Sequence, residues 1–242
     1  MKITYVIPTY NEAENLPKLA AALFELKVPG LNALIVDDNS PDGSGQMAED
    51  LGRQYDGRIK VLHRPGKMGL GSAYREGFKK ALADGADAVG QMDADFSHPL
   101  SKIADMVAAV QSYDVVIGSR YIPGGSLDER WPLWRKGLSG FGNFYARTIL
   151  GMKLKDVTGG FKLWRRATLQ GMPLDDIRSN GYIFQVEMSY VASKLGYTFK
   201  EIPIYFADRR WGQSKMSFRI QIEAALRTWQ LIGRYSNLKK TH

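Results

Sequence analysis

The sequence predicts an α/β protein with a mostly parallel central sheet flanked by helices. Three observations lead to this prediction. Through the first 120 of the 242 residues, short apolar runs alternate with segments of helical spacing. The apolar runs are continuous, which is typical of parallel strands covered on both faces. Polar clusters close nearly every predicted strand, at the carboxyl ends where such sheets bind ligands.

In the first half, strands and helices are expected to alternate, joined by right-handed crossovers. The strands are expected at 3–10, 32–40, 59–64, 86–95 and 114–120, and the helices at 12–27, 43–55, 70–85 and 99–112.

The regular alternation of strands and helices ends at Arg120. A glycine- and proline-rich loop with two tryptophans is expected at 121–137. The expected elements that follow are a helix at 141–151, a strand and helix within 157–169, a helix at 182–196, a strand at 198–210 and a long helix at 216–235. No internal repeat is visible, so we expect one continuous domain over 1–242.

The composition limits the possible classes of protein. The chain has no cysteine, which excludes disulfides and thiolate metal sites. Its net charge of +8 favours anionic partners, and eight lysines and arginines with a single acid lie between Arg209 and His242. We see no signal peptide and no apolar stretch of about 18 residues that could span a membrane. A cytoplasmic protein is therefore expected.

Asp93 and Asp95 close the strand expected at 86–95. Residues i and i+2 of a strand point to the same side, so the two carboxylates can converge and would repel without a cation between them. Mg²⁺ or Mn²⁺ fits, and Mg²⁺ usually adds phosphate oxygens to one or two carboxylates, which indicates a diphosphate ligand. The alternative is an acidic turn in which Ser97 caps a helix that begins at Pro99.

Asp37 and Asp38 close another strand, where an acid often holds a ribose hydroxyl; an ordinary turn is the alternative. The stretch GKMGLGSAYREG at 66–77 matches neither glycine-rich phosphate-binding pattern, so we interpret it as a tight turn before a helix. A structural role is expected for His98, because the three histidines show no metal or triad spacing.

Eight segments together resemble a known family. VIPTYNEAENL, VDDNSPDGS, MGLGSAYREGF, QMDADFSHP, VIGSRY, VTGGFKLWRR, GYIFQVEM and RRWGQSKMS occur in this order. Over about residues 3 to 220 the chain resembles the family 2 glycosyltransferases of the GT-A fold, a Rossmann-like nucleotide-diphospho-sugar transferase fold. Within them it is similar to the dolichol (polyprenol) monophosphate mannose synthases.

The resemblance implies metal-dependent transfer of mannose from GDP-mannose to a polyprenyl (dolichyl) phosphate, with inversion at the anomeric carbon. It divides the domain into a nucleotide-sugar half at 1–120, an acceptor half at 121–215 and a basic amphipathic helix and tail at 216–242.

The implied site residues form three groups. The nucleotide sugar would be held by Pro8, Tyr10, Glu12, Asp37, Asp38, Asp93 and Gln185, and the Mg²⁺ or Mn²⁺ by Asp93 and Asp95. The acceptor phosphate would be held by Arg120, Arg135, Ser139, Arg209 and Lys215, with Asp95, Arg120 and Arg209 as the catalytic residues. Where the family often has a glutamine two residues after the second aspartate, this chain has Ser97, so a third metal ligand stays open.

A polyprenyl acceptor implies peripheral attachment to the cytoplasmic membrane face, either directly or through a small membrane-anchoring subunit. Phe218, Ile222, Ala225, Trp229 and Ile232 fall on one helix face, which either contacts lipid or packs on the protein's own core or a partner.

Two other functions are open. One keeps the fold and moves glucose or another hexose from a UDP-sugar to the same lipid. The other is a non-catalytic module that binds anions or nucleic acid, but the chain shows no nucleic-acid motif, and we expect no nucleic-acid partner.

Overall fold

The computed structural model describes the backbone of residues 1–208 and 218–238, and the side chains of residues 1–208 and 226–238. A seven-stranded sheet lies at its centre, in the order β3-β2-β1-β4-β7-β5-β8. The strands are β1 Ile3–Thr9, β2 Leu31–Asp37, β3 Ile59–His63, β4 Ala88–Gln91, β5 Val115–Ser119, β7 Lys162–Arg165 and β8 Phe199–Pro203. Two short strands, β6 Ser126–Leu127 and β9 Tyr205–Phe206, pair separately.

Six of the seven strands run in the same direction, which confirms the predicted fold class. Strand β7 is antiparallel to both of its neighbours, β4 and β5. The carboxyl ends of β1, β2, β3, β4 and β5 therefore meet at one edge of the sheet. At this edge Asp37 pairs in register with Thr9 and His63.

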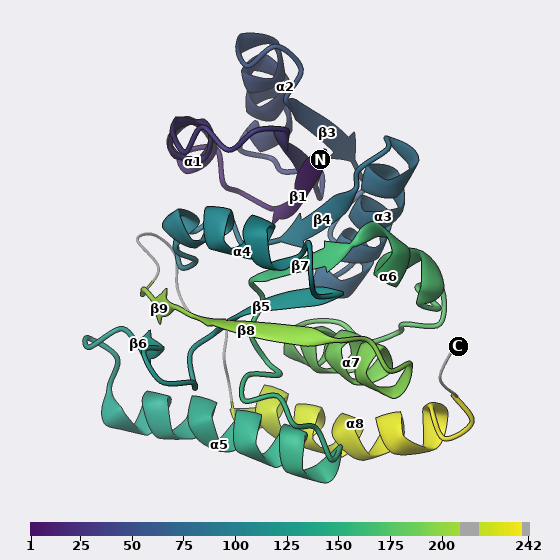
Figure 1. Ribbon diagram of the computed structural model, residues 1–242. Coiled ribbons are helices and arrows are strands. Elements are labelled where there is room, and N and C mark those ends of the chain that lie inside the picture. Colours follow the sequence, from purple (N-terminus) through teal and green to yellow (C-terminus); the bar gives the residue numbers. More distant parts are fainter. Residues whose placement is uncertain (209–217, 239–242) are drawn as a thin grey trace.

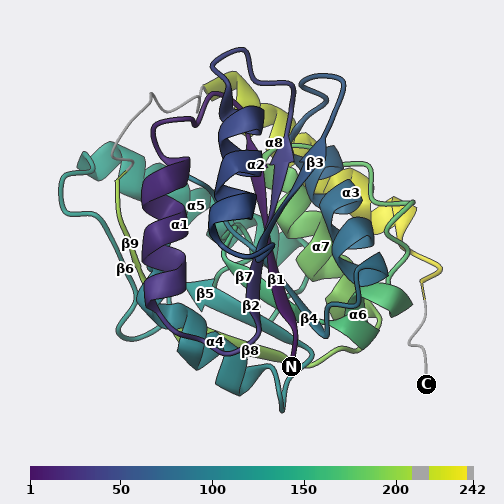
Figure 2. The same ribbon diagram turned by 90° about the horizontal axis from the view of Figure 1, so that it is seen from above.

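Helices cover both faces of the sheet (Figures 1 and 2). One face packs against α1 Leu16–Glu25, α2 Ser44–Gln54 and α4 Ile103–Ala109, the last preceded by the 3₁₀ turn η1 Leu100–Lys102. The other packs against α3 Leu70–Ala83, α6 Arg166–Gly171 and α7 Tyr182–Lys194. Helices α5 Leu133–Ile149 and α8 Phe218–Arg234 lie side by side beyond α7 (Figure 1).

Three of the expected elements differ in the structure. Helix α5 begins at Leu133, eight residues before the helix expected at 141–151, so part of the expected loop is helical. The signal was Pro132, because proline is favoured where a helix starts. Strand β4 ends at Gln91, so the acid pair lies in the loop that follows it. The strand expected at 198–210 is divided into β8 and β9.

Strands β1 and β4 pack closely at Gly90 in β4. Gly90 stands opposite Tyr5 of β1, and a Cβ atom built on Gly90 would lie 2.4 Å from the Tyr5 ring. Tyr5 is itself fully buried.

The Gly90→Ala substitution is expected to lower the free energy of unfolding by about 1–3 kcal/mol, because the ring has no space to move into. Urea denaturation measures this. The matched control is Gly137→Ala in α5, where a Cβ meets nothing within 4 Å and alanine should raise helix stability by up to about 1 kcal/mol. Equal effects of the two substitutions would contradict this account of the packing.

Candidate active site

The expected nucleotide residues gather at the ends of β1 and β2. Asp37 is buried, and its carboxylate accepts hydrogen bonds from the Ser40 hydroxyl at 2.5 Å and the Ser40 amide at 3.3 Å. Pro8 lies in β1, and Tyr10, directly after that strand, presents an exposed ring with the Lys67 amine 4.1 Å from its centroid. The Glu12 carboxylate accepts a hydrogen bond from Asn15 at 2.5 Å. These four side chains border one end of the sheet's ligand edge.

Asp38 has a partner that the sequence did not reveal. The fully buried Arg64, which follows β3, donates to the Asp38 carboxylate at 2.5 Å and also pairs with Glu76 at 3.2 Å. Burial raises the pKa of Asp38 even though Arg64 opposes this shift. Asp38 therefore serves the ion pair in this structure, and its contact with a nucleotide stays a prediction.

The loop after β4, at residues 92–99, holds Asp93 and Asp95, and we call it the acidic loop. The Asp93 amide donates to His98 Nδ1 at 3.1 Å, and its carboxylate accepts from the Tyr74 hydroxyl at 3.4 Å. Asp95 is buried and accepts from the Ser97 amide at 3.1 Å. Phe96, directly after Asp95, has a φ of 62°, a rare backbone conformation for a residue with a bulky side chain. The argument that strand geometry aligns the two acids is thus wrong, because the loop places them.

The alternative interpretation, in which Ser97 caps a helix, is wrong. The helical segment begins at Leu100 with Pro99 as its cap residue and no side-chain cap bond. Among the residues that the structure describes, the buried Ser97 hydroxyl has no hydrogen-bond partner. In the described part of the chain no three His, Cys, Asp or Glu side chains gather as a metal site. Two carboxylates with an unsatisfied hydroxyl nearby fit a cation that takes its other ligands from phosphate and water.

His98 has the structural role expected of it. Its buried ring stacks on Phe161, with 5.2 Å between ring centroids, and meets the edge of Phe206 at 5.5 Å. Because Nδ1 accepts the Asp93 amide, this nitrogen carries no proton. His98 thereby braces the acidic loop against β9.

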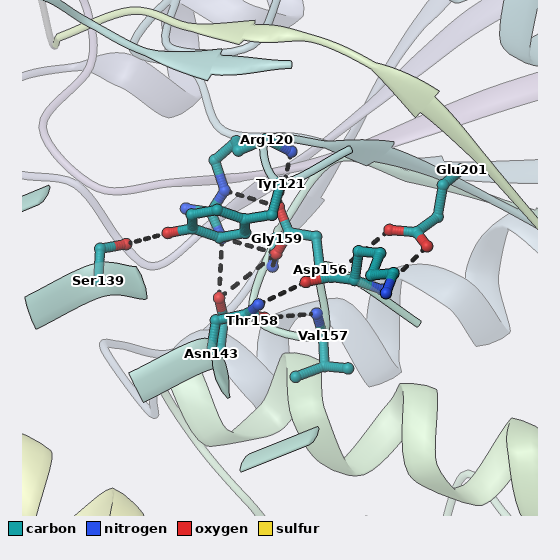
Figure 3. Close-up of polar contacts among 10 residues, drawn as sticks. Arg120, Tyr121, Ser139, Asn143, Asp156, Val157, Thr158, Gly159 and Glu201 are labelled. Atoms are coloured by element: carbon teal, nitrogen blue, oxygen red, sulfur yellow. Dashed lines mark hydrogen bonds and ion pairs between the residues drawn. The ribbon is translucent and has the colours of Figure 1, made fainter. Parts of the chain in front are cut away.

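A buried ion pair fixes Arg120 at the end of β5 (Figure 3). Arg120 donates to both carboxylate oxygens of Asp156, from Nε at 2.7 Å and from Nη2 at 2.8 Å. The Arg120 amide adds a bond of 3.0 Å to the same carboxylate. Burial alone would raise the pKa of the Asp156 carboxyl, but Arg120 outweighs it and holds the pKa below its usual range. In the described part of the chain, Arg120 Nη1 has no protein acceptor.

The loop that carries Asp156 is clamped from two sides. Glu201 of β8 accepts the amides of Lys155 and Asp156 at 2.9 and 3.0 Å. Asn143 of α5 donates to the Lys155 carbonyl and accepts the Val157 amide at 2.8 Å. Figure 3 shows both clamps meeting at the loop. The sequence missed Asp156, Asn143 and Glu201, and the only signal was the position of Asp156 directly before VTGG.

Arg135 and Ser139 lie on α5, on the side of the ion pair. The Arg135 guanidinium lies 3.6 Å from the centroid of the Trp131 ring and pairs with Asp208 at 3.3 Å. The Ser139 hydroxyl bonds the Tyr121 hydroxyl at 2.7 Å, and Tyr121 in turn lies against Arg120. The structure therefore brings Arg120, Arg135 and Ser139 to one region. Arg209 and Lys215 lie outside the described residues.

Gln185 is buried in the first turn of α7. Its amide oxygen accepts a hydrogen bond at 2.5 Å from the side chain of Gln91, the last residue of β4. This places Gln185 beneath the acidic loop, which begins directly after Gln91. The contact of Gln185 with a nucleotide sugar stays a prediction.

Helix α8 packs on the protein's own core through one face. Leu231 and Tyr235 are buried, and Ile232 packs against the same cluster. The fully buried Glu187 of α7 accepts from Arg234 at 2.9 Å and from the Tyr235 hydroxyl at 2.8 Å. The apolar face expected from spacing is thus divided: Ile232 faces the core and Trp229 is exposed. Phe218, Ile222 and Ala225 lie outside the described side chains.

Large apolar side chains are exposed on α5 and α8. Trp229 of α8 donates to the Tyr145 hydroxyl of α5 at 2.8 Å, and Phe141 lies 6.2 Å from Tyr145 between ring centroids. This α5–α8 apolar surface consists of Leu133, Trp134, Phe141, Phe144, Leu226 and Trp229, each more than half exposed. In the part of the chain that the structure describes, no helix is long and apolar enough to cross a membrane.

Comparison with known proteins gives close relatives over nearly the whole chain. Residues 4–171 match the model of the family described as glycosyl transferase family 2. The chain is 42% identical over 241 residues to an undecaprenyl-phosphate mannosyltransferase of Micrococcus luteus, covering 99% of this chain and 98% of the relative. It is 40% identical to a polyprenol monophosphomannose synthase of Mycolicibacterium smegmatis, covering 95% and 87%.

Solved structures share the fold at lower identity. A mannosyltransferase from Pyrobaculum calidifontis, in complex with GDP-Man and Mn²⁺, aligns with a TM-score of 0.64 at 17% identity, covering 100% of this chain and 66% of that one. Glucosyl-3-phosphoglycerate synthase from Mycobacterium tuberculosis, in complex with Mn²⁺ and UDP, aligns with a TM-score of 0.64 at 15% identity, covering 96% and 79%. These likenesses confirm the GT-A fold.

Asp156→Asn is expected to destabilise the protein by about 3–5 kcal/mol, because it leaves the buried Arg120 cation without its counter-charge. Thermal and urea denaturation measure the loss. The control is Asp50→Asn, which breaks the exposed pair with Arg53 and should cost less than about 1 kcal/mol. A loss at Asp156 as small as that at Asp50 would show that the ion pair does not stabilise the loop.

Proposed function

Because the chain belongs to glycosyl transferase family 2, we propose that it is an enzyme that moves mannose from GDP-mannose to a polyprenyl monophosphate. The products are polyprenyl-phosphate-mannose and GDP. The acceptor and sugar classes follow the names of the two relatives at 40 and 42% identity. The guanine nucleotide and Mn²⁺ follow the complex of the Pyrobaculum calidifontis protein, a more distant similarity.

The observation that carries the proposal is the meeting of acidic and basic groups at one edge of the sheet. Asp93 donates its amide to His98, His98 meets Phe206, and the Arg120 guanidinium lies 5.4 Å from the centroid of the same Phe206 ring. Two residues, His98 and Phe206, thus link the acidic loop to the arginine through three contacts. A reaction between a sugar diphosphate and a lipid phosphate needs such a site, because it must hold two anions close together.

The nucleotide end of the site matches guanosine diphosphate chemically. Asp37 offers a buried carboxylate, which can only accept hydrogen bonds when ionised, and guanine offers N–H donors. Tyr10 offers an exposed ring against which a base can stack. Pro8 and Glu12 flank these two, and the diphosphate would extend from them towards Asp93 and Asp95.

Asp93 and Asp95 would hold the Mg²⁺ or Mn²⁺ ion. When bound, this ion would neutralise charge on the departing GDP. Asp93 and Asp95 are in turn held by His98, Tyr74 and the Ser97 amide. Burial and the neighbouring Asp93 raise the pKa of Tyr74 well above its usual value, so its hydroxyl keeps its proton and can donate to that carboxylate.

The acceptor phosphate would lie between Arg120, Arg135 and Ser139. Asp156 fixes two of the nitrogens of Arg120, which leaves Nη1 to donate to the phosphate. A guanidinium suits this role because it stays charged and binds phosphate oxygens with a fixed geometry. Arg209 and Lys215 remain predicted contacts to the same phosphate.

The chemistry needs no general base from the protein. A phosphate monoester has a second pKa of about 6, so at neutral pH the acceptor is already a mostly ionised nucleophile. One of its oxygens attacks the anomeric carbon while the bond from that carbon to the GDP oxygen breaks, and the electron pair leaves with GDP. A single displacement of this kind inverts the anomeric configuration.

The α5–α8 apolar surface would rest on the membrane that contains the polyprenyl chain. Tryptophan and other large apolar side chains are favoured at membrane interfaces, and α5 also carries Arg135 and Ser139. Attachment through this surface would bring the acceptor site to the level of the lipid phosphates. The protein is then peripheral to the membrane, and we expect it on the cytoplasmic face.

The full chain, incubated with Mn²⁺, polyprenyl phosphate and a panel of labelled nucleotide sugars, is expected to transfer label into the lipid phase from GDP-mannose. Asp95→Asn should lower the rate by more than about 100-fold, because it removes half of the charge that holds the cation. The exposed Asp175→Asn serves as the control and should keep the wild-type rate. Transfer from UDP-glucose instead would contradict the mannose assignment, and full activity of Asp95→Asn would contradict the metal assignment.

The double substitution Trp134→Ser and Phe144→Ser is expected to weaken binding to vesicles of anionic phospholipid at least about tenfold, since burying each ring contributes more than about 1 kcal/mol. Co-sedimentation with vesicles measures this. Met47→Ser, on the exposed surface of α2, is the control. If the double variant sediments like the wild type, this surface does not contact the membrane.

A further inference from the structure

A buried amine lies between the sheet and α7. Lys162 of β7 is fully buried, and its amine donates to the Gln185 carbonyl at 2.9 Å, the Gln185 amide oxygen at 3.2 Å and the Ser189 hydroxyl at 2.9 Å. Burial lowers the pKa of Lys162 to about 7. An amine held out of water costs stability unless its hydrogen bonds are satisfied, and here two of its three bonds go to the same residue.

Three hydrogen bonds determine the orientation of the Gln185 amide. The indole nitrogen of Trp164 can only donate, and it donates to the Gln91 amide oxygen at 2.9 Å. The Gln91 nitrogen must then be the atom that points to Gln185, and it donates to the Gln185 amide oxygen at 2.5 Å. Since Lys162 donates to the same oxygen, the nitrogen of the Gln185 amide must point the other way.

That nitrogen points towards the acidic loop. A Cβ atom built on Gly160 would lie 3.5 Å from Gln185 Nε2 and 3.6 Å from a ring carbon of His98. His98 is the residue that accepts the Asp93 amide. In the described part of the chain, no protein acceptor receives a hydrogen bond from Gln185 Nε2. A buried amide thus presents two N–H donors beside the proposed site for the sugar diphosphate.

We propose that Lys162 and Gln91 are positioning residues that aim the Gln185 amide nitrogen at an oxygen of the bound nucleotide sugar. This inference rests on the proposed function. Gln185 makes the contact, and Lys162 and Gln91 act only through it. The charge of the amine is not required, because a neutral Lys162 can keep both bonds to Gln185 while Ser189 reverses its hydroxyl and donates to the nitrogen.

The alternative for Lys162 is a purely structural role in the core. The two roles differ in coupling: a positioning residue loses its effect once Gln185 can no longer bind the ligand, whereas a structural residue does not. A double-mutant cycle measures this difference directly.

The cycle uses Lys162→Met, Gln185→Leu and the combined variant in the full chain, with Mn²⁺ present. Isothermal titration with GDP-mannose gives the Kd of each. Each single variant is expected to bind GDP-mannose about tenfold more weakly, as for loss of one hydrogen bond to a charged or polar ligand. The combined variant should be no more than about threefold weaker than Gln185→Leu alone. Lys79→Met, the same change on the exposed surface of α3, is the matched control.

Titration with GDP and with guanosine identifies the oxygen. Weaker binding of both GDP-mannose and GDP assigns the contact to the diphosphate, and weaker binding of GDP-mannose alone assigns it to the sugar. Binding of guanosine should stay unchanged in every variant, because the proposed guanosine site lies at β1 and β2. If Lys162→Met does not fold, as judged by its thermal transition, Gln91→Leu replaces it in the same cycle.

Losses that add fully in the combined variant would overturn the inference, as would an equal loss of guanosine affinity or no loss at all. These results differ from failure of the proposed function. A wild-type chain that binds no GDP-mannose and transfers no mannose would contradict the proposed function itself.

Discussion

The buried ion pair between Arg120 and Asp156 is the interaction on which the arrangement of the site depends. It joins the end of β5 to a loop that is held by Asn143 of α5 and Glu201 of β8. The Asp156 carboxylate leaves one guanidinium nitrogen of Arg120 available. The same contacts fix α5, which carries Arg135, Ser139 and half of the α5–α8 apolar surface. One neutralised charge pair therefore sets the position of both the phosphate-binding groups and the proposed membrane contact.

The antiparallel strand β7 is the second constraint. It separates β4 from β5, and so it keeps the acidic loop and Arg120 at one edge without allowing them to pair with each other. Phe206 and His98 fill the space between the two charges with aromatic rings. Strand β7 also carries Lys162 beneath the acidic loop, opposite Gln91. The site thus has separate regions for two anions, which is what transfer between two phosphate-bearing substrates requires.

The sequence predicted the parts of the fold that depend on local pattern. Continuous apolar runs identified β1 to β5, and the polar residues at their ends lie at the ligand edge as expected. The prediction for Asp93 and Asp95 had the correct edge but the wrong geometry, because strand β4 ends at Gln91 and Phe96 turns the chain. Composition was misleading at 121–137, where glycine, proline and tryptophan suggested a loop although Pro132 starts a helix.

The contacts that the sequence could not predict join segments far apart in the chain. Asp156 lies 36 residues from Arg120, and Gln185 lies 23 residues from Lys162. No periodicity relates such partners, since only the packing of α7 and the loop against the sheet brings them together. The buried face of α8 was not predicted either, because Thr228, Leu231 and Tyr235 face the core and the expected face carried Trp229, which is exposed.

The central claim is a single displacement in which a polyprenyl phosphate oxygen replaces GDP on mannose. The most direct measurement is nuclear magnetic resonance of the lipid product formed from GDP-α-mannose that carries ¹³C at the anomeric carbon. The account predicts a β-mannosyl phosphate, with the labelled carbon coupled to the phosphorus of the lipid. An α-linked product, or labelled carbon without coupling to phosphorus, would contradict it.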